Sequence, residues 1–202
     1  MTVDPQTNDP REVYHHLVHA IVPRPIGWIS TRSTAGVDNV APYSFFNAVC
    51  ARPAAVMFSG TVGRGGDDKD TVRNVRDTGV FAVNLVSEDL AEAMNATSAG
   101  VPPDESEFDH ARLDKRPAEL IDVPLVAAAK VTMECRLMQF VKIGEGPMSC
   151  TITIGEVVRM TVAEAVLGED GYADSTKLAA VGRMGGLSYV RTRDVFDLDR
   201  PR

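Results

Sequence analysis

Polar side chains that could bind a small anion gather in three short segments, residues 23–31, 39–47 and 69–71. The third segment, Lys-Asp-Thr, follows a glycine-rich stretch at a predicted helix start. A bound phosphate is typically held by short hydroxyl and amide donors, by a lysine, and by the free backbone N–H groups at a helix N-terminus. The residues concerned are Ser30, Thr31, Ser44, Asn47, Lys69 and Thr71.

The first two segments also carry aromatic side chains: Trp28, Tyr43, Phe45 and Phe46. Flat rings can stack on an aromatic ligand, and a phosphate joined to a large ring describes flavin mononucleotide (FMN). Ordinary explanations exist for the same residues, because a single strand tryptophan is commonly core and Asp70 could simply cap a helix. From the residues alone, a flavin is one of several ligands that fit.

Motifs for other chemistries are missing. The glycine clusters at 63–66 and 182–186 have neither the dinucleotide-binding nor the P-loop spacing. His15 and His19 share a helix face, but no glutamate completes a zinc motif. No G-x-S-x-G elbow is present. We therefore expect neither a metal site nor a catalytic protein side chain.

Composition narrows the function classes. The chain has 28 acidic and 21 basic residues, a net charge of -7, and no basic stripe, which argues against nucleic-acid binding. It has no apolar run near the roughly 20 residues of a membrane helix and no leader-like N-terminus. Its three cysteines form no C-x-x-C pair. We expect a reduced, cytoplasmic protein.

The pattern of elements predicts a mainly β protein with a few helices rather than a doubly wound sheet. At 202 residues, a single domain over 1–202 is expected, with 1–9 and 198–202 as flexible ends. Strands are predicted at 26–31, 40–49, 54–59 and 80–86, with a long hairpin at 126–143 and 149–162. Helices are predicted from Asp9 to before Pro23, over 69–77, and over 87–98. Loops are predicted at 60–68 and 100–124, and the second is long enough to be functional.

Six motifs in this order resemble the flavin reductase-like FMN-binding split-barrel family, in its flavoprotein oxygenase and flavoredoxin-like branch. They are PRPIGWIST, N-x-APYSFFN, KDTVRNV, VFAVNLVSEDLAEAMN, ESEFDHARL and VGRMGGLSY. The resemblance extends from about residue 12 to about residue 197. It implies a split β-barrel of Greek-key type and a homodimer with FMN near the subunit interface.

The resemblance also implies roles for individual segments. The segment around Trp28, Ser30 and Thr31 would lie along the flavin, and Lys69, Asp70 and Thr71 would hold the phosphate. Arg183, in the glycine-rich C-terminal motif, is a further cofactor-binding candidate. The ring and ribityl chain would contact Ala41, Pro42, Tyr43, Ser44, Phe45 and Asn47.

The implied activity is that of an NAD(P)H:flavin oxidoreductase, with NADH or NADPH as electron donor and a partner monooxygenase or another acceptor as recipient. Two alternatives remain open at this point: a flavoredoxin-like electron carrier with prosthetic FMN, and a non-catalytic flavin-binding barrel. The sequence does not choose between NADH and NADPH or between FMN and FAD.

One departure from the family pattern is Arg112, which stands where many members have glycine. An arginine adopts a positive φ only at a cost. We therefore expect a different turn at this point.

Overall fold

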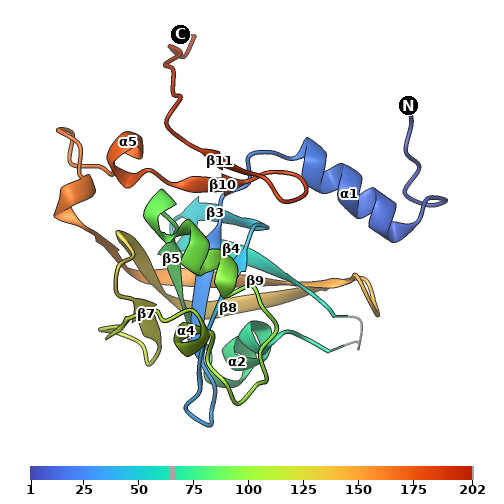
Figure 1. Ribbon diagram of the computed structural model, residues 1–202, viewed down its shortest axis with the longest axis horizontal. Helices are drawn as coiled ribbons and strands as arrows, with labels where there is room; N and C mark the ends of the chain where they lie inside the picture. Colours follow the sequence, from blue (N-terminus) through green and yellow to red (C-terminus); the bar gives the residue numbers. More distant parts are fainter. Residues whose placement is uncertain (64–66, 202) are drawn as a thin grey trace.

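A seven-stranded antiparallel sheet forms the centre of the computed structural model, which describes residues 1–63 and 67–201 (Figure 1). Part of the predicted 60–68 loop, residues 64–66, lies outside the described residues. The strands follow the order β2-β1-β5-β8-β9-β4-β3 across the sheet. Their bounds are β1 (Gly27–Arg32), β2 (Asp38–Tyr43), β3 (Phe46–Ala51), β4 (Ala54–Thr61), β5 (Val80–Leu85), β8 (Val131–Ile143) and β9 (Cys150–Val162).

The sheet curls into a barrel because its two edge strands are neighbours in the sequence. Only Ser44 and Phe45 separate β2 at one edge from β3 at the other. The edges must therefore meet at this point, and side chains from the inner face fill the enclosed space. The core includes Ile29, Tyr43, Phe46, Val56, Phe58, Val72, Val75, Phe81, Val83 and Cys135. The prediction of a mainly β barrel is confirmed.

The single strand predicted over 40–49 is wrong, because the chain changes edges there. β2 pairs with β1, with Pro42 opposite Trp28, whereas β3 pairs with β4. Proline is tolerated in β2 because an edge strand needs partners on one side only. Residues 43–46, Tyr-Ser-Phe-Phe, include no glycine or proline that would mark a break between two strands.

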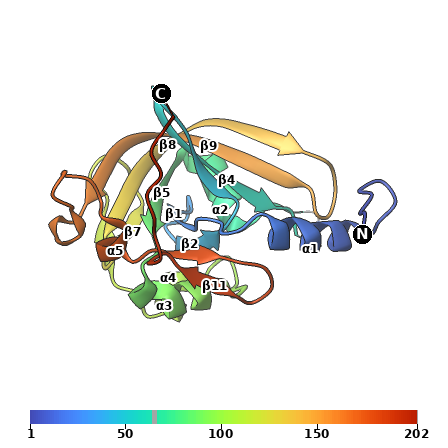
Figure 2. The ribbon, with the colours of Figure 1, turned by 90° about the horizontal axis from the view of Figure 1, so that it is seen from above.

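The long hairpin is confirmed, although its first strand begins later than predicted. Residues 124–126 form a separate short strand, β7 (Pro124–Val126), which pairs with β6 (Lys115–Pro117). β8 and β9 then pair along almost their whole length, with irregularities at Glu134/Cys135 and Leu137/Gln139. In Figure 2 the two strands arch across the top of the barrel.

Helix α2 (Asp70–Thr78) covers one end of the barrel. One face carries Thr71, Val72, Asn74 and Val75, all buried. The helix ends at Gly79, whose φ of +74° is the left-handed conformation that glycine adopts easily. The helix predicted over 69–77 is thus confirmed.

A second core lies outside the barrel, under the segment that follows β5. The predicted helix over 87–98 is present as a short 3₁₀ turn, Glu88–Leu90, followed by α3 (Ala91–Ala96). The predicted 100–124 loop contains α4 (Glu107–His110) and β6. Between these segments and the sheet lie Ile26, Trp28, Val40, Val86, Leu90, Met94, Phe108, Val126, Ala129 and Val181.

Helix α1 (Pro10–Ala20) extends to one side of the barrel (Figures 1 and 2). Asp9 caps it by accepting a hydrogen bond from the Arg11 N–H at 2.8 Å. The buried Arg24 fixes its end, donating to the carbonyls of Val18 and Ile21 and, at 2.9 Å, to that of Met184. Arg24 therefore ties α1 to the C-terminal glycine-rich motif.

That motif forms the turn between β10 (Val181–Arg183) and β11 (Tyr189–Arg191). A Cβ atom on Gly185 would lie 2.2 Å from the ring of His19. A side chain at position 185 would therefore displace the His19 ring from its place on α1. The chain continues through a 3₁₀ turn at Glu164–Val166 and α5 (Ser175–Leu178) before β10. Among the described residues, no helix has the length and apolarity to cross a membrane.

The expectation of an altered turn at Arg112 is wrong. Arg112 adopts a φ of +53°, so the backbone keeps the left-handed conformation that a glycine would favour. The surrounding contacts stabilise it: the Leu113 N–H donates to the Phe108 carbonyl at 2.8 Å, and Phe108 is fully buried. Burial of Phe108 thus outweighs the local cost at Arg112.

Candidate functional site

A cleft of about 220 Å³ opens between β2, the first turn of α2 and the segment after α3. We call it the α2 cleft. The structure brings six of the predicted site residues together there: Ala41, Pro42, Tyr43, Lys69, Asp70 and Thr71. Asn39, Glu107 and residues 97–101 complete the lining.

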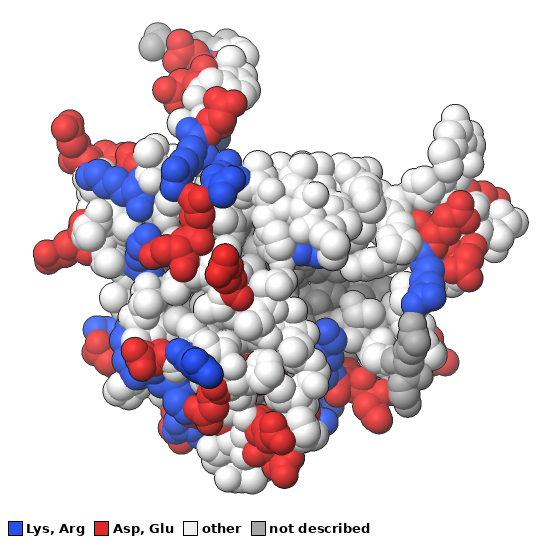
Figure 3. All heavy atoms as spheres, in the orientation of Figure 1, with Lys and Arg blue, Asp and Glu red and all other residues white. Residues whose placement is uncertain are grey.

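A second cleft of about 220 Å³ continues from the first. We call it the Arg183 cleft; Pro42 and Ser98 line both. It contains two more predicted residues, Ser44 and Arg183, together with Tyr14, Ile26, Met94, Asn95 and Tyr189. Figure 3 shows this face hollowed between helix α1 and the body of the barrel. The two clefts form one groove with a basic side chain at each end, Lys69 and Arg183.

The first turn of α2 presents backbone donors to the groove. Lys69 stands at the N-cap in an extended conformation, and its side chain makes no capping hydrogen bond. The N–H groups of the first turn have no partner within a helix, and the helix dipole adds positive potential there. The Lys69 ammonium group is 5.9 Å from the centre of the Tyr43 ring. This end of the groove is suited to an anionic group.

The side chains at the base of the α2 cleft form a buried polar network. The Asn39 amide nitrogen donates to both carboxylate oxygens of Glu107, at 2.8 and 2.9 Å. The Asn39 oxygen accepts from the hydroxyls of Thr71 at 2.8 Å and Thr31 at 3.2 Å. Burial raises the pKa of the Glu107 carboxyl group, while hydrogen bonds from the backbone and Asn39 oppose the rise.

This network limits how Thr71 can act. Its side chain is almost fully buried, and its one hydroxyl proton is donated to Asn39. The Thr71 hydroxyl therefore cannot also donate to a bound anion. The donors at this position are the backbone N–H groups.

Tyr43 carries an unpaired polar atom in the same place. Its hydroxyl is buried without a hydrogen-bond partner among the described residues. Burial is the main cause of the raised pKa of this phenol, and the nearby Thr71 hydroxyl, outside good hydrogen-bond geometry, opposes the rise. A buried hydroxyl that remains unpaired costs free energy, so the lining of the α2 cleft retains capacity for a polar ligand.

Trp28, Ser30 and Thr31 lie beneath the groove rather than along it. All three are fully buried. The indole N–H of Trp28 donates to the Thr97 hydroxyl at 2.8 Å, and the Ser30 hydroxyl donates to the Pro124 carbonyl at 2.6 Å. The expectation of a stacking surface on Trp28 is therefore wrong; its side chain instead holds Thr97, which lines the cleft.

Two other predicted residues lie near the end of β2. Phe45 is half-buried, with its ring 6.4 Å from that of Tyr14 on α1. Asn47 is exposed on β3, and its side-chain oxygen accepts from the Ala48 N–H at 2.8 Å. Neither lines the two clefts described above.

Arg183 is partly buried in its cleft. Its guanidinium group lies 4.5 Å from the centre of the Tyr189 ring and donates to the Gly186 carbonyl at 2.6 Å. A guanidinium group held by a ring and a carbonyl keeps further N–H donors free. Arg183 therefore remains a candidate for ligand contact.

Sequence reasoning missed Asn39, Glu107 and residues 97–101. Asn39 lies at the end of a turn and Glu107 in a polar loop, positions where such residues are ordinary. They are recognised as site residues only because the fold brings them into hydrogen-bond contact although they are 68 positions apart in the sequence. A single sequence contains no signal of that pairing.

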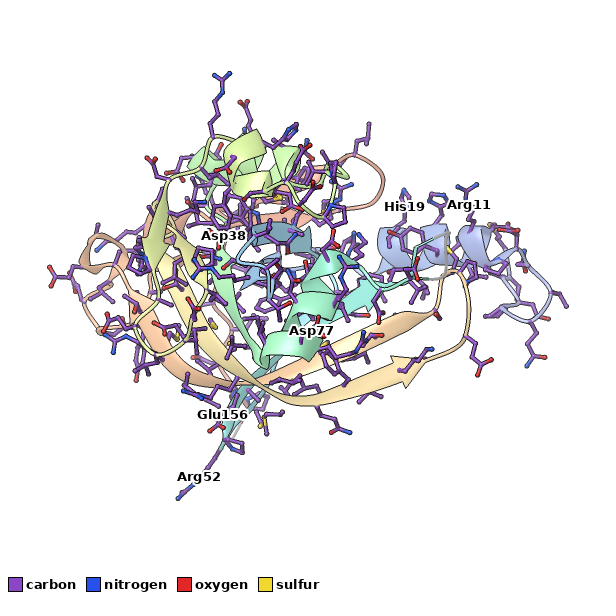
Figure 4. The ribbon with its side chains drawn as sticks, turned by 90° about the horizontal axis from the view of Figure 1, so that it is seen from below. Arg11, His19, Asp38, Arg52, Asp77 and Glu156 are labelled. Atoms are coloured by element: carbon purple, nitrogen blue, oxygen red, sulfur yellow. The ribbon has the colours of Figure 1, made fainter. Side chains whose placement is uncertain are left out.

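The histidines of α1 have structural contacts. The His19 ring nitrogen lies 2.7 Å from the His15 carbonyl, and the ring covers Gly185. In Figure 4, His19 and Arg11 lie on α1, away from Asp77 on α2. Arg52, at the β3–β4 turn, projects from the far end of the sheet. Within 1–63 and 67–201, no three histidine, cysteine or acidic side chains are grouped to hold a metal ion.

Residues 19–182 match the model of the flavin reductase like domain, and this range contains both sides of the α2 cleft. The chain belongs to the flavin reductase-like family. A relative in Halalkalibacterium halodurans, described as uncharacterized, is 38% identical over 100% of this chain and 97% of its own length.

Two solved structures extend the family resemblance. Nitrilotriacetate monooxygenase component B from Bacillus cereus superposes with a TM-score of 0.93, at 34% identity and 98% coverage of both chains. The 2-nitrobenzoate 2-nitroreductase of Pseudomonas fluorescens gives a TM-score of 0.88 at 27% identity, covering 100% of this chain and 96% of that one. The split-barrel fold of the flavin reductase-like family is thus confirmed, and these neighbours support an oxidoreductase.

Proposed function

We propose that this flavin reductase-like protein is an NAD(P)H:flavin oxidoreductase that binds FMN and supplies reduced flavin or electrons to a partner. The observation that carries the proposal is the first turn of α2, where the Lys69 side chain makes no capping hydrogen bond, opening into a groove next to the Tyr43 hydroxyl, which has no hydrogen-bond partner among the described residues. This set fits a phosphate at one end and a polar ring system further along.

The residues present would divide the ligand between them. The backbone N–H groups of the α2 first turn and the Lys69 ammonium group would hold the phosphate. Ala41, Pro42, Tyr43 and Ser44 would line the ribityl chain and ring, with Phe45 and Asn47 at the margin. Trp28, Ser30 and Thr31 would act from below by fixing the strand and Thr97.

The protein's own residues would bind and orient rather than exchange protons. When bound, FMN supplies hydride and electron transfer, chemistry that belongs to the cofactor. The clefts contain no histidine beside a nucleophile. The carboxylate of Glu107 is occupied by Asn39 and Val40. We therefore expect no indispensable catalytic side chain.

The electron donor in this proposal is NADH or NADPH, and the acceptor is a partner monooxygenase or another oxidant. The resemblance to a protein described as a monooxygenase component supports an acceptor on a separate protein. A flavoredoxin-like electron carrier is the alternative that the donor experiment below separates.

We also propose a homodimer. The edge strand β3 has most of its residues exposed, including Val49, 49% exposed. Met138 and Met160 on the long hairpin are 49% and 55% exposed. Exposed apolar side chains on an edge strand, as for Val49, or on the face of a sheet, as for the two methionines, favour association. The molar mass in solution, measured by light scattering during gel filtration, tests this proposal.

The test of activity is a visible absorbance spectrum of the purified protein with FMN, recorded anaerobically before and after NADH or NADPH. Flavin bands that either nicotinamide bleaches support the reductase and identify the donor. Bands that persist with both donors contradict the reductase and favour the electron carrier or the non-catalytic flavin-binding barrel. Failure to retain or titrate FMN contradicts the cofactor assignment.

A further inference from the structure

Glu107 reaches the α2 cleft from a segment distant in sequence. It is only 6% exposed, although its neighbours 104 and 105 are exposed. Its carboxylate accepts hydrogen bonds from the Asn39 amide and, at 3.2 Å, from the Val40 N–H. A buried carboxylate needs such partners, because an unpaired buried charge is costly. Glu107 is therefore held by β2 in a single arrangement.

The chemistry of a carboxylate determines how Asn39 is oriented. An ionised carboxylate only accepts hydrogen bonds, so the NH₂ group of Asn39 must face Glu107. The Asn39 oxygen must then face α2. There it accepts the hydroxyl protons of Thr71 and Thr31.

The same chain of hydrogen bonds continues into α2. The Thr31 hydroxyl oxygen accepts from the Asn74 side-chain nitrogen at 3.1 Å. Thr71 and Asn74 lie one turn apart on the buried face of α2. Asn39 therefore fixes α2 at two points, directly at Thr71 in the first turn and through Thr31 at Asn74 in the next, and Glu107 fixes Asn39.

We infer that Glu107 is a positioning residue of the α2 cleft, which orients the Asn39 amide and through it the phosphate-binding first turn of α2. This inference rests on the proposed binding of FMN. A glutamine at this position keeps one acceptor oxygen for the Val40 N–H but places an NH₂ group where the second carboxylate oxygen accepts from the Asn39 amide. Asn39 would lose the partner that fixes its orientation.

A positioning role and a purely electrostatic role of Glu107 predict opposite changes in FMN affinity when its charge is removed. The Glu107 carboxylate has the same sign of charge as a phosphate, so removing that charge alone would strengthen anion binding. Loss of the positioning hydrogen bonds would weaken it. The sign of the change therefore separates the two explanations.

The experiment compares Glu107→Gln with the wild type by titrating FMN and riboflavin, which lacks the phosphate, and following flavin fluorescence. Glu105→Gln is the matched control, since Glu105 is an exposed carboxylate in the same segment. For Glu107→Gln we expect about tenfold weaker FMN binding, the loss of roughly one charge-assisted hydrogen bond. Riboflavin affinity, and both affinities of Glu105→Gln, are expected to stay within about twofold.

A stronger affinity of Glu107→Gln for FMN, or an equal loss for both flavins, would overturn the inference. If Glu107→Gln does not fold, Thr71→Val breaks the chain at its other end with little change of shape. That variant is expected to lose FMN affinity and keep riboflavin affinity, and unchanged FMN binding would overturn the inference. A wild-type protein that binds neither flavin rejects the proposed function itself.

Discussion

The two ends of the groove are built differently. At the α2 end, buried side chains bond to one another across distant segments, as Asn39 does with Glu107 and Thr71. At the Arg183 end, guanidinium groups bond to backbone carbonyls: Arg24 to those of Val18, Ile21 and Met184, and Arg183 to that of Gly186. The first arrangement sets the orientation of side chains. The second fastens segments of backbone together.

This difference implies that substitutions at the two ends have different consequences. Changes at the Arg183 end should mainly alter stability, because the docking of α1 depends on them. Changes at the α2 end should mainly alter ligand binding. The following predictions test that division.

The largest effect is expected for Arg24→Met, which keeps the apolar stem and removes the donors. Three carbonyls would lose their partner, and the unfolding free energy should fall by about 2–4 kcal/mol. Urea unfolding followed by circular dichroism measures the change. Arg11→Met, exposed on α1, is the control and should have little effect. A loss below about 0.5 kcal/mol for Arg24→Met would contradict the fastening role.

At the other end, Lys69→Ala should weaken FMN binding about twofold to fivefold, as expected for an exposed charge pair. Riboflavin affinity and unfolding free energy should stay unchanged, because Lys69 is exposed. Fluorescence titration in low and high salt measures both affinities, and salt should reduce the difference between variant and wild type. Unchanged FMN affinity at low salt would remove Lys69 from the site.

The raised pKa of Glu107 predicts a pH dependence of stability. A carboxyl group whose pKa is higher in the folded state than in the unfolded state binds its proton more tightly when folded. The contribution of Glu107 to the free energy of unfolding is therefore favourable at low pH. It is lost as the pH rises from 4.5, the ordinary pKa of a glutamate, through the raised pKa of the folded state. Urea unfolding of wild type and Glu107→Gln over this range should give a flatter curve for the variant. Parallel curves for the two proteins would mean that Glu107 is not the source of the pH dependence of stability.

The smallest effect is expected for Arg112→Gly, just after the helix that carries Glu107. The position has a φ of +53°, where glycine avoids the strain of a side chain. Relief of that strain stabilises the folded state, whereas the greater conformational entropy of glycine stabilises the unfolded state. The net effect should be a stabilisation of about 0.5–1 kcal/mol. Thermal unfolding measures it. A lower melting temperature would show that the Arg112 side chain contributes more than its backbone strain costs.

Local signals in the sequence were sufficient for many elements. The capping Asp9 and the prolines after residue 22 bounded α1, and Gly79 ended α2. Alternating residue types located β1, and apolar or β-like runs between turn residues located β4, β5 and the β8–β9 hairpin. These features depend on neighbours a few positions apart, so one sequence contains them. The resemblance to a family then supplied the segments that form the groove.

Tertiary structure alone decided how the site is assembled. Curling of the sheet divided residues 40–49 between two edges and placed Trp28 inside, where its indole supports Thr97 rather than a ligand. The contact of Glu107 with Asn39 and the positive φ of Arg112 depend on packing between distant segments. The sequence by itself determined the elements and the residue types available to a flavin. Their positions around the groove came from burial and hydrogen bonding over long sequence separations, which no local pattern encodes.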